Sequence, residues 1–319
     1  MSKPNILGLS DILRASTEVT VDLDQIPELS NEFNVAAATA EPIEEDCVMC
    51  ELFAFCGEHP ALLHFALQEF ASHSDDTRNA EGWGIAHYVD GDVRLVKEAA
   101  VASNSACLQF IEQHPLNTTL LLSHIRRATQ GAMAVRNCQP FMRELGGAMH
   151  VFAHNGHLDR AALEQLAAAG EFSPVGETDS ELAFCVLLAG LRPLWRNGTR
   201  PPAIDQRRQV VAAFARQMRE LGPANFIYAD GDALFAHAHK RTQSDGGVRP
   251  PGLWVLCRSC ALDLDAAGLQ IATPLAQGSQ LLVASVPLSN DPWRPVEEGE
   301  LLVAQCGASK LAGGVAEAA

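Results

Sequence analysis

The sequence predicts an α+β protein in which antiparallel or mixed sheets carry helices on their outer faces. Strand-like segments outnumber helical ones, and the helices fall between groups of strands rather than alternating with them one for one. Neither a G-x-G-x-x-G nor a Walker-type loop occurs, so no nucleotide cofactor is expected. A chain of 319 residues, of which 47% are hydrophobic, has ample material for a buried core.

Residues 1–48 differ in composition from the rest of the chain. They contain ten acidic residues and two basic ones, which supply half of the net charge of −16. Large apolar side chains are sparse, so the segment cannot bury enough surface to offset its ordering entropy. We expect a disordered leader at residues 1–48, a folded domain at residues 49–306 and a disordered tail at residues 307–319. The leader could reflect a start codon placed upstream of a true start at Met49, a propeptide, or a genuine extension.

The expected strands are short apolar runs bounded by turn residues. Asp90-Gly91, between two of these runs, is a strong hairpin signal. Residues 242–251 are rich in Gly and Pro and are expected to form a surface loop. Strands are expected at residues 51–56, 84–89, 93–97, 118–125, 148–153, 225–228, 233–238, 253–256, 280–286 and 300–303.

Three helices are expected between these strands. Residues 61–71 place apolar side chains at helical spacing. Thr178-Asp179-Ser180-Glu181 has the form of a capping box before an apolar run, so a helix begins there, with Asp179 in its first turn. Residues 205–221 carry one apolar face and form the third helix.

The overall charge and the lack of long apolar runs limit the possible partners. A net charge of −16 argues against nucleic acid, because binding to phosphates draws on clustered Lys and Arg. No apolar run approaches the ~18 residues of a membrane helix, and the N-terminus lacks a signal-type segment. A cytoplasmic protein without a membrane partner is expected. Nine scattered cysteines fit reduced thiols better than a disulfide framework.

Cys50, at the junction between the acidic leader and the apolar domain, is the candidate nucleophile. A free α-amino group has a pKa of about 7.7–8, so a cysteine at the chain terminus could pass its thiol proton to its own amine. Translation from Met49, followed by removal of that methionine, would expose this amine. Alternatively, Cys50 is an ordinary buried cysteine in a strand.

Polar residue types also occur at the ends of other expected elements. Asn155-Gly156 could form an oxyanion hole from side-chain and backbone N–H donors, or could be an ordinary turn. Arg126 or Arg127 could hold a carboxylate bidentately, or could form a solvated pair. Asp179 could bind an ammonium group, or could only cap its helix.

A zinc site is a minor alternative. His237-Ala238-His239 and Cys257-Arg258-Ser259-Cys260 together supply the ligand types of a Cys2His2 site. The spacing is not that of a zinc finger, so no metal is expected.

Six motifs in one order make a more specific pattern, which covers Cys50 to about Gln305. The motifs are Met49-Cys50-Glu51-Leu52, Gly82-Trp83-Gly84, the run from His124 to Gly131, Asn137-Cys138-Gln139-Pro140-Phe141, His154-Asn155-Gly156 and the run from Gly176 to Glu181. This pattern resembles the class II glutamine amidotransferases, which are N-terminal-nucleophile hydrolases. The resemblance is closest to their YafJ-like branch, which contains stand-alone amidotransferase domains and γ-glutamyl hydrolases of thiol metabolism.

The resemblance implies a four-layer αββα sandwich of two antiparallel sheets. It also implies that Cys50 is the nucleophile and, through its α-amine, the general base, with Asn155 and Gly156 as the oxyanion hole. No cofactor or metal is implied. The sequence departs from the family in carrying Cys138 in place of a commoner Thr or Ala, and more seriously in the leader before Cys50.

Substrate binding is implied by the same resemblance. Arg126 matches the residue that holds the carboxylate of glutamine, and Asp179 matches the residue that receives its α-ammonium group. Thr129 and Gln130 match the segment lining the substrate pocket, and Trp83 matches a tryptophan beside it.

The implied reaction is hydrolysis of the γ-carboxamide of glutamine, or of a γ-glutamyl compound, through a thioester on Cys50. Two alternatives stay open. The domain could be the ammonia-supplying subunit of a two-chain synthase. It could also be a non-catalytic γ-glutamyl-binding protein if residues 1–48 stay attached, because the amine of Cys50 would then be locked in a peptide bond.

Overall fold

The computed structural model describes residues 50–65, 82–101, 105–114, 116–126, 131–168, 170–195, 200–258, 269–272 and 279–306. The chain divides into two units, residues 1–44 and 45–319, and every described residue lies in the second. The disorder expected for residues 1–48 and 307–319 therefore falls outside the described residues and stays a prediction. Among the helices that the structure describes, none is long and apolar enough to cross a membrane.

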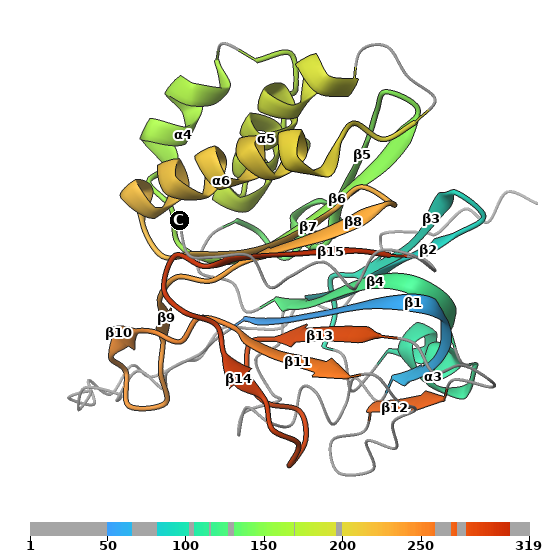
Figure 1. Cartoon of the computed structure of the whole chain (residues 1–319). Helices are drawn as coiled ribbons and strands as arrows, with labels where there is room; N and C mark the ends of the chain where they lie inside the picture. The colour runs from blue at the N-terminus through green and yellow to red at the C-terminus, as the bar shows by residue number, and fades with distance from the viewer. Residues whose placement is uncertain are drawn as a thin grey trace, which may run out of the picture. The chain divides into compact units, whose positions relative to one another are not determined.

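The larger of the two main sheets has eight strands in the order β14-β11-β13-β1-β4-β2-β3, with β12 added beside β1 (Figure 1). Its described pairings are antiparallel. β1 and β4 are neighbours at the centre of this sheet. Because they run antiparallel, the start of β1 lies beside the end of β4. The strands are β1 Glu51–Phe65, β2 Gly82–Val89, β3 Asp92–Glu98, β4 Leu116–Arg126, β11 Trp254–Arg258, β12 Leu269–Ala272, β13 Gln280–Ala284 and β14 Arg294–Pro295.

The smaller main sheet has five antiparallel strands in the order β15-β8-β7-β6-β5. A separate short hairpin pairs β9 with β10. The strands are β5 Phe141–Leu145, β6 Ala148–Gly156, β7 Ala224–Ala229, β8 Ala233–His237, β9 Arg241–Thr242, β10 Val248–Arg249 and β15 Leu301–Gln305.

Three apolar cores separate four layers (Figure 1). The first core lies between the smaller sheet and the three helices on its outer face, which are α4 Arg160–Ala167, α5 Asp179–Trp195 and α6 Ile204–Leu221. The second core lies between the two sheets. The third core lies on the outer face of the larger sheet and includes residues of α3 Ala106–Gln113. Since both faces of β1 are covered, it buries apolar side chains on both sides, with Leu52 and Ala54 in the core between the sheets and Phe53 and Phe55 in the core on the outer face. The expected αββα sandwich is confirmed.

The structure confirms the hairpin turn predicted at Asp90-Gly91, and it confirms the capping box predicted at residues 178–181 in part. Asp90 and Gly91 both have positive φ, 54° and 81°, as a tight turn between β2 and β3 requires. At the start of α5, the Thr178 hydroxyl accepts a hydrogen bond from the Glu181 N–H at 3.2 Å. The Glu181 carboxylate instead accepts one from the Gly176 N–H at 2.6 Å, so only half of the expected capping box forms.

The helix expected at residues 61–71 is wrong at its start, because β1 continues as a strand to Phe65. Leu62 and Leu63 pair with β4 on one side and with β12 on the other. Pairing on both sides with strands distant in the sequence outweighs the helical spacing of the apolar residues. Residues 66–71 lie outside the described residues. The sequence patterns also did not indicate α3, α4 or β5, or the β9–β10 hairpin within the loop expected at residues 242–251.

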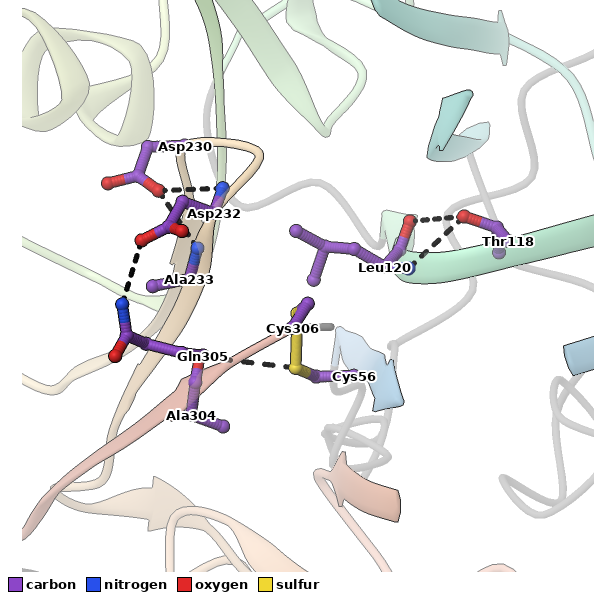
Figure 2. The surroundings of a disulfide bond; sticks show 9 residues. All are labelled: Cys56, Thr118, Leu120, Asp230, Asp232, Ala233, Ala304, Gln305 and Cys306. Atoms are coloured by element: carbon purple, nitrogen blue, oxygen red, sulfur yellow. Dashed lines mark hydrogen bonds between the residues drawn. A yellow bond between two sulfur atoms is a disulfide. The ribbon is translucent and has the colours of Figure 1, made fainter. Parts of the chain in front are cut away.

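A disulfide joins Cys56 to Cys306, whereas the sequence favoured reduced thiols over a disulfide framework. Cys56 lies on β1 and Cys306 follows β15, so the bond connects the two sheets (Figure 2). Beside it, the Gln305 amide donates to the Asp232 carboxylate at 2.9 Å (Figure 2). A separation of 250 residues explains why no local pattern indicates this pairing. The other described cysteines form no disulfide: Cys50, Cys107, Cys138, Cys185 and Cys257.

Three fully buried histidines predict a loss of stability in mild acid. Burial lowers the pKa of His124 to about 3, of His150 to about 4 and of His237 to about 3. Below about pH 6.5 the unfolded chain takes up a proton at each histidine while the folded protein does not, so the free energy of unfolding falls as the pH falls. Each histidine should remove up to about 1.4 kcal/mol per pH unit between about pH 6 and 5. Urea unfolding across this range measures the slope.

Replacement of the exposed His114 by Gln is the control, because it removes a histidine and leaves the three buried rings in place. Equal free energies of unfolding at about pH 7 and 5 would contradict the expectation.

Candidate active site

The candidate catalytic and binding residues lie where four elements of the fold begin or end. Glu51 pairs with Ile125 in the larger sheet, and the antiparallel register therefore places the residue before Glu51 beside the residue after Ile125. These two residues are the candidate nucleophile and the candidate carboxylate-binding arginine. By element, Cys50 precedes β1, Arg126 ends β4, Asn155 and Gly156 end β6, and Asp179 begins α5.

One hydrogen bond connects the candidate nucleophile in the larger sheet with the candidate oxyanion residue in the smaller sheet. The Asn155 Nδ2 donates to the carbonyl oxygen of Cys50 at 2.5 Å. An amide nitrogen carries two hydrogens, so this bond uses one of the two donors of Asn155. Cys50 is partly exposed, and its thiol is not part of a disulfide. The second amide hydrogen is suited to an oxygen that gains charge when a thiolate attacks a carbonyl.

Asn225, on the neighbouring strand β7, fixes the backbone of Asn155 through a hydrogen bond. It is fully buried and lies opposite Asn155 in the register of β6 and β7. Its Nδ2 donates to the carbonyl oxygens of Asn155 at 3.1 Å and Lys240 at 2.8 Å, and its Oδ1 accepts from the His239 N–H at 2.7 Å. The sequence did not indicate this role. Its only local signal is an amide at the start of an apolar strand.

Gly156 occupies a position with no room for a side chain. It pairs with Ala224 across β6 and β7. A Cβ at this position would overlap the carbonyl oxygen of Pro223 and crowd the ring of His154. Glycine is therefore the residue type that lets the end of β6 approach β7 this closely.

Asp179 is buried in the first turn of α5, and backbone groups fix its carboxylate. One carboxylate oxygen accepts a hydrogen bond from the Leu158 N–H at 2.8 Å, and the other accepts one from the Ser180 N–H at 2.9 Å. Each carboxylate oxygen can accept a further hydrogen bond, so the group can still receive an ammonium ligand.

Side-chain contacts also tie together the loops that follow β4 and precede α5. The buried Arg126 donates from Nη2 to the carbonyl oxygen of Gly131 at 2.9 Å. The buried Asn137 donates to the carbonyl oxygen of Ala132 at 2.9 Å and accepts from the Glu177 N–H at 2.9 Å. The sequence did not indicate the role of Asn137, because its contact with Glu177 spans 40 residues.

Two buried histidines lie near these residues and are weak bases. Burial, followed by the positive charges of His154 and Arg126, lowers the pKa of His124 to about 3. Burial also lowers the pKa of His154, whose Nδ1 lies 2.9 Å from the hydroxyl of Ser180. Gln139 holds the backbone of His154 with two hydrogen bonds, of 2.7 and 3.0 Å. Neither ring is therefore poised to take a proton from a thiol near neutral pH.

Trp83 does not lie with this group. It is fully buried on β2, in the core that covers the outer face of the larger sheet, where Leu121 and Ile125 also lie. Cys50 and Asn155 meet on the other side, between the sheets. Thr129 and Gln130 lie outside the described residues.

The residues of the zinc alternative come from different sheets. His237 lies on β8 and its Nδ1 donates to the carbonyl oxygen of Glu300 at 3.0 Å, whereas Cys257 lies on β11. Cys260 lies outside the described residues. Within the described part of the chain, no three acidic, histidine or cysteine side chains lie together as metal ligands would.

Comparison of the sequence with known proteins identifies relatives. A family model described as "Glutamine amidotransferases class-II" matches residues 49–318. "Putative glutamine amidotransferase YafJ" from Escherichia coli K12 is 30% identical over 255 residues, which cover 79% of this chain and 96% of that protein. An uncharacterized protein from Methanocaldococcus jannaschii is 28% identical over 261 residues, which cover 80% of this chain and 69% of that protein.

Solved structures share the fold. A predicted glutamine amidotransferase from Pseudomonas aeruginosa PA01 superposes with a TM-score of 0.57 and 27% identity, over 83% of this chain and all of that chain. The glutamine phosphoribosylpyrophosphate amidotransferase from B. subtilis, at 19% identity, has a TM-score of 0.50 over 80% of this chain and 47% of its own. The second likeness concerns the fold alone. Because the family model matches residues 49–318, the chain belongs to the class II glutamine amidotransferases.

Proposed function

We propose that the protein hydrolyses the γ-carboxamide of glutamine, or of a γ-glutamyl compound, through a glutamyl thioester on Cys50. Membership of the glutamine amidotransferase family supports the substrate class. The observation that carries the assignment of residues is the hydrogen bond of 2.5 Å from the Asn155 amide to the carbonyl oxygen of Cys50. It holds the backbone of the candidate nucleophile, in the larger sheet, against the candidate oxyanion donor, in the smaller sheet.

The reaction would proceed in two steps. The α-amine of Cys50 takes the thiol proton, the thiolate attacks the γ-carbonyl carbon, and Asn155 and Gly156 donate to the resulting oxyanion. The C–N bond then breaks, and ammonia or an amine leaves with the proton from the α-ammonium group. Water attacks the thioester, which releases the γ-carboxylate and restores the thiol. No step requires a metal or an organic cofactor.

Charged residues at the two ends of the site would orient the substrate. Arg126 would bind the α-carboxylate and Asp179 the α-ammonium group, with Thr129 and Gln130 lining the space between. Trp83 packs behind β4 and would support the pocket from the outer face of the sheet. Two fixed charges of opposite sign select an α-amino acid over a simple amide, because each substrate charge finds a partner.

This chemistry requires that no residue precede Cys50. An acylated nitrogen is not basic, so the peptide bond between Met49 and Cys50 would abolish the general base. We therefore propose that the active form begins at Cys50, either by initiation at Met49 and its removal or by cleavage of residues 1–49.

Replacing Cys50 with Ala in protein that begins at residue 50 tests the proposal. Glutamate release from glutamine should fall to the level of the blank, a loss of roughly 10⁴-fold or more, because the nucleophile is gone. Coupled enzymatic detection of glutamate measures it. Cys107→Ala is the matched control, since Cys107 lies on α3 and also forms no disulfide. Activity that survives in Cys50→Ala rules out the thioester.

A further inference from the structure

The helix α6 presents two different faces. Its inner face packs on the smaller sheet through Val211 and Phe214 (Figure 1). From the same side, the buried Arg207 forms ion pairs with Asp230 at 2.7 Å and Asp232 at 2.5 Å. The inner arginine of α6 is therefore paired with two carboxylates.

A second face of α6 borders a pocket of about 250 Å³ that lies outside the candidate active site. Arg208, Arg216 and Arg219 line it from the helix, and Gly299 and Leu301 line it from the start of β15. Arg208 and Arg219 are eleven residues apart, about three helical turns, so they lie along one stripe of α6. Three arginines thus border one small space.

Arg208 and Arg216 are exposed and Arg219 is partly buried, and none of the three is paired with a carboxylate of the described residues. Within the described part of the chain, no ion pair joins any of them to an acidic residue, although Glu220 lies one helical turn from Arg216. Glu298, next to Gly299, pairs with Lys240 at 3.2 Å instead. Several arginines on other elements do form ion pairs: Arg136 with Glu177, Arg143 with Glu181, Arg160 with Glu164, Arg192 with Glu171, Arg249 with Asp245 and Arg294 with Glu300.

Gly299 makes room for one of these groups. Its φ is +88°, a conformation that favours glycine, and a Cβ there would collide with Nη1 of Arg219. The turn before β15 therefore brings the Arg219 guanidinium against the pocket wall.

We propose that this pocket binds a small polyanion bearing two or more ionised oxygens. Guanidinium groups hold phosphate and carboxylate oxygens bidentately, and three of them suit a ligand with more than one charge. The pocket is smaller than the ~300–1,000 Å³ of sites for drug-sized molecules, which restricts the ligand to a compact one. The ligand chemistry is that of a phosphorylated or polycarboxylate metabolite. The site is separate from the glutamine-binding residues.

Titration calorimetry of the full chain at fixed ionic strength tests the site, with inorganic pyrophosphate and citrate as the two probes. At least one probe should bind saturably at one site. Arg216→Gln and Arg219→Gln should each weaken that binding about tenfold or more, because each removes a charge-assisted contact. Arg94→Gln is the matched control. It removes an exposed arginine of β3 that, in the described part of the chain, also lacks an ion pair.

Preference for pyrophosphate identifies a phosphorylated ligand, and preference for citrate a polycarboxylate. Circular dichroism of each variant without ligand confirms that it is folded. Failure of both probes to bind the wild-type chain would overturn the proposal. So would an equal loss in Arg94→Gln, which would report net charge rather than a site, or binding that is indifferent to Arg216→Gln and Arg219→Gln.

Discussion

Protein in which a residue stays attached to Cys50 should hydrolyse glutamine roughly 10²–10⁴-fold more slowly than the same protein beginning at Cys50, the range that general base catalysis contributes. A free α-amine with a pKa of about 7.7–8 can accept the thiol proton, whereas an amide nitrogen cannot. Steady-state glutamate release compares the two forms. The first begins at Cys50, and the second carries one added alanine before it, which blocks the amine with the smallest change in bulk.

The two buried histidines near the site are not suited to replace the amine. His124 is a poor proton acceptor, because burial lowers its pKa to about 3. The pKa of His154 is lowered by burial too, and its Nδ1 lies 2.9 Å from the Ser180 hydroxyl on α5. Neither of these rings should therefore compensate for the loss of the amine.

The pH dependence gives an independent check on this prediction. The rate of the form beginning at Cys50 should rise through the pKa of the α-amine, about 7.7–8, and the alanine-extended form should lack this rise. Equal rates for the two forms would refute the role of the amine. Intact mass of protein from the native host, if it begins at Cys50, establishes that the cell makes the competent form.

The parts of the fold that could be predicted are those that local residues determine. Asp90-Gly91 indicates a hairpin, because both positions need positive φ, and the Thr178 hydroxyl marks the start of α5. The prediction fails at residues 61–65, because their apolar spacing fits a helix as well as a strand. Only pairing with β4 and β12 decides in favour of the strand. The helix α4 had a local signal that was missed: Asp159 accepts from the Ala162 N–H at 3.1 Å as an N-cap.

In the candidate site, too, some features follow from local sequence and others depend on contacts between distant residues. The motifs predict which residues would perform the chemistry, and two of these, Cys50 and Asn155, are joined by a hydrogen bond in the structure. The motifs do not identify the residues that hold the candidate catalytic residues in place. Asn225 contacts Asn155 across 70 residues, and Asn137 contacts Glu177 across 40, so their roles exist only in the folded chain. A buried amide has no periodicity or spacing that would distinguish it from a turn residue.

Replacement of Asn155 by Ala should lower kcat by roughly 10²–10³-fold, the effect of removing one oxyanion donor. KM should change much less, because Asn155 would donate to an oxygen that carries full charge only in the transition state. Asn155→Asp should be at least as impaired, since it replaces two N–H donors with a carboxylate that repels the oxyanion. Asn117→Ala, at an exposed position of β4, is the control.

The same variant separates two roles that the geometry gives to Asn155. Its amide could stabilise the oxyanion, or it could act only by holding Cys50 through the 2.5 Å bond to the Cys50 carbonyl. Alkylation of the thiol by iodoacetamide forms a carbon–sulfur bond without passing through an oxyanion, so it reports the placement and ionisation of Cys50 alone. If Asn155 stabilises the oxyanion, Asn155→Ala should alkylate at nearly the wild-type rate while glutamine hydrolysis collapses. A parallel fall in both rates would assign Asn155 to positioning and remove it from the oxyanion hole.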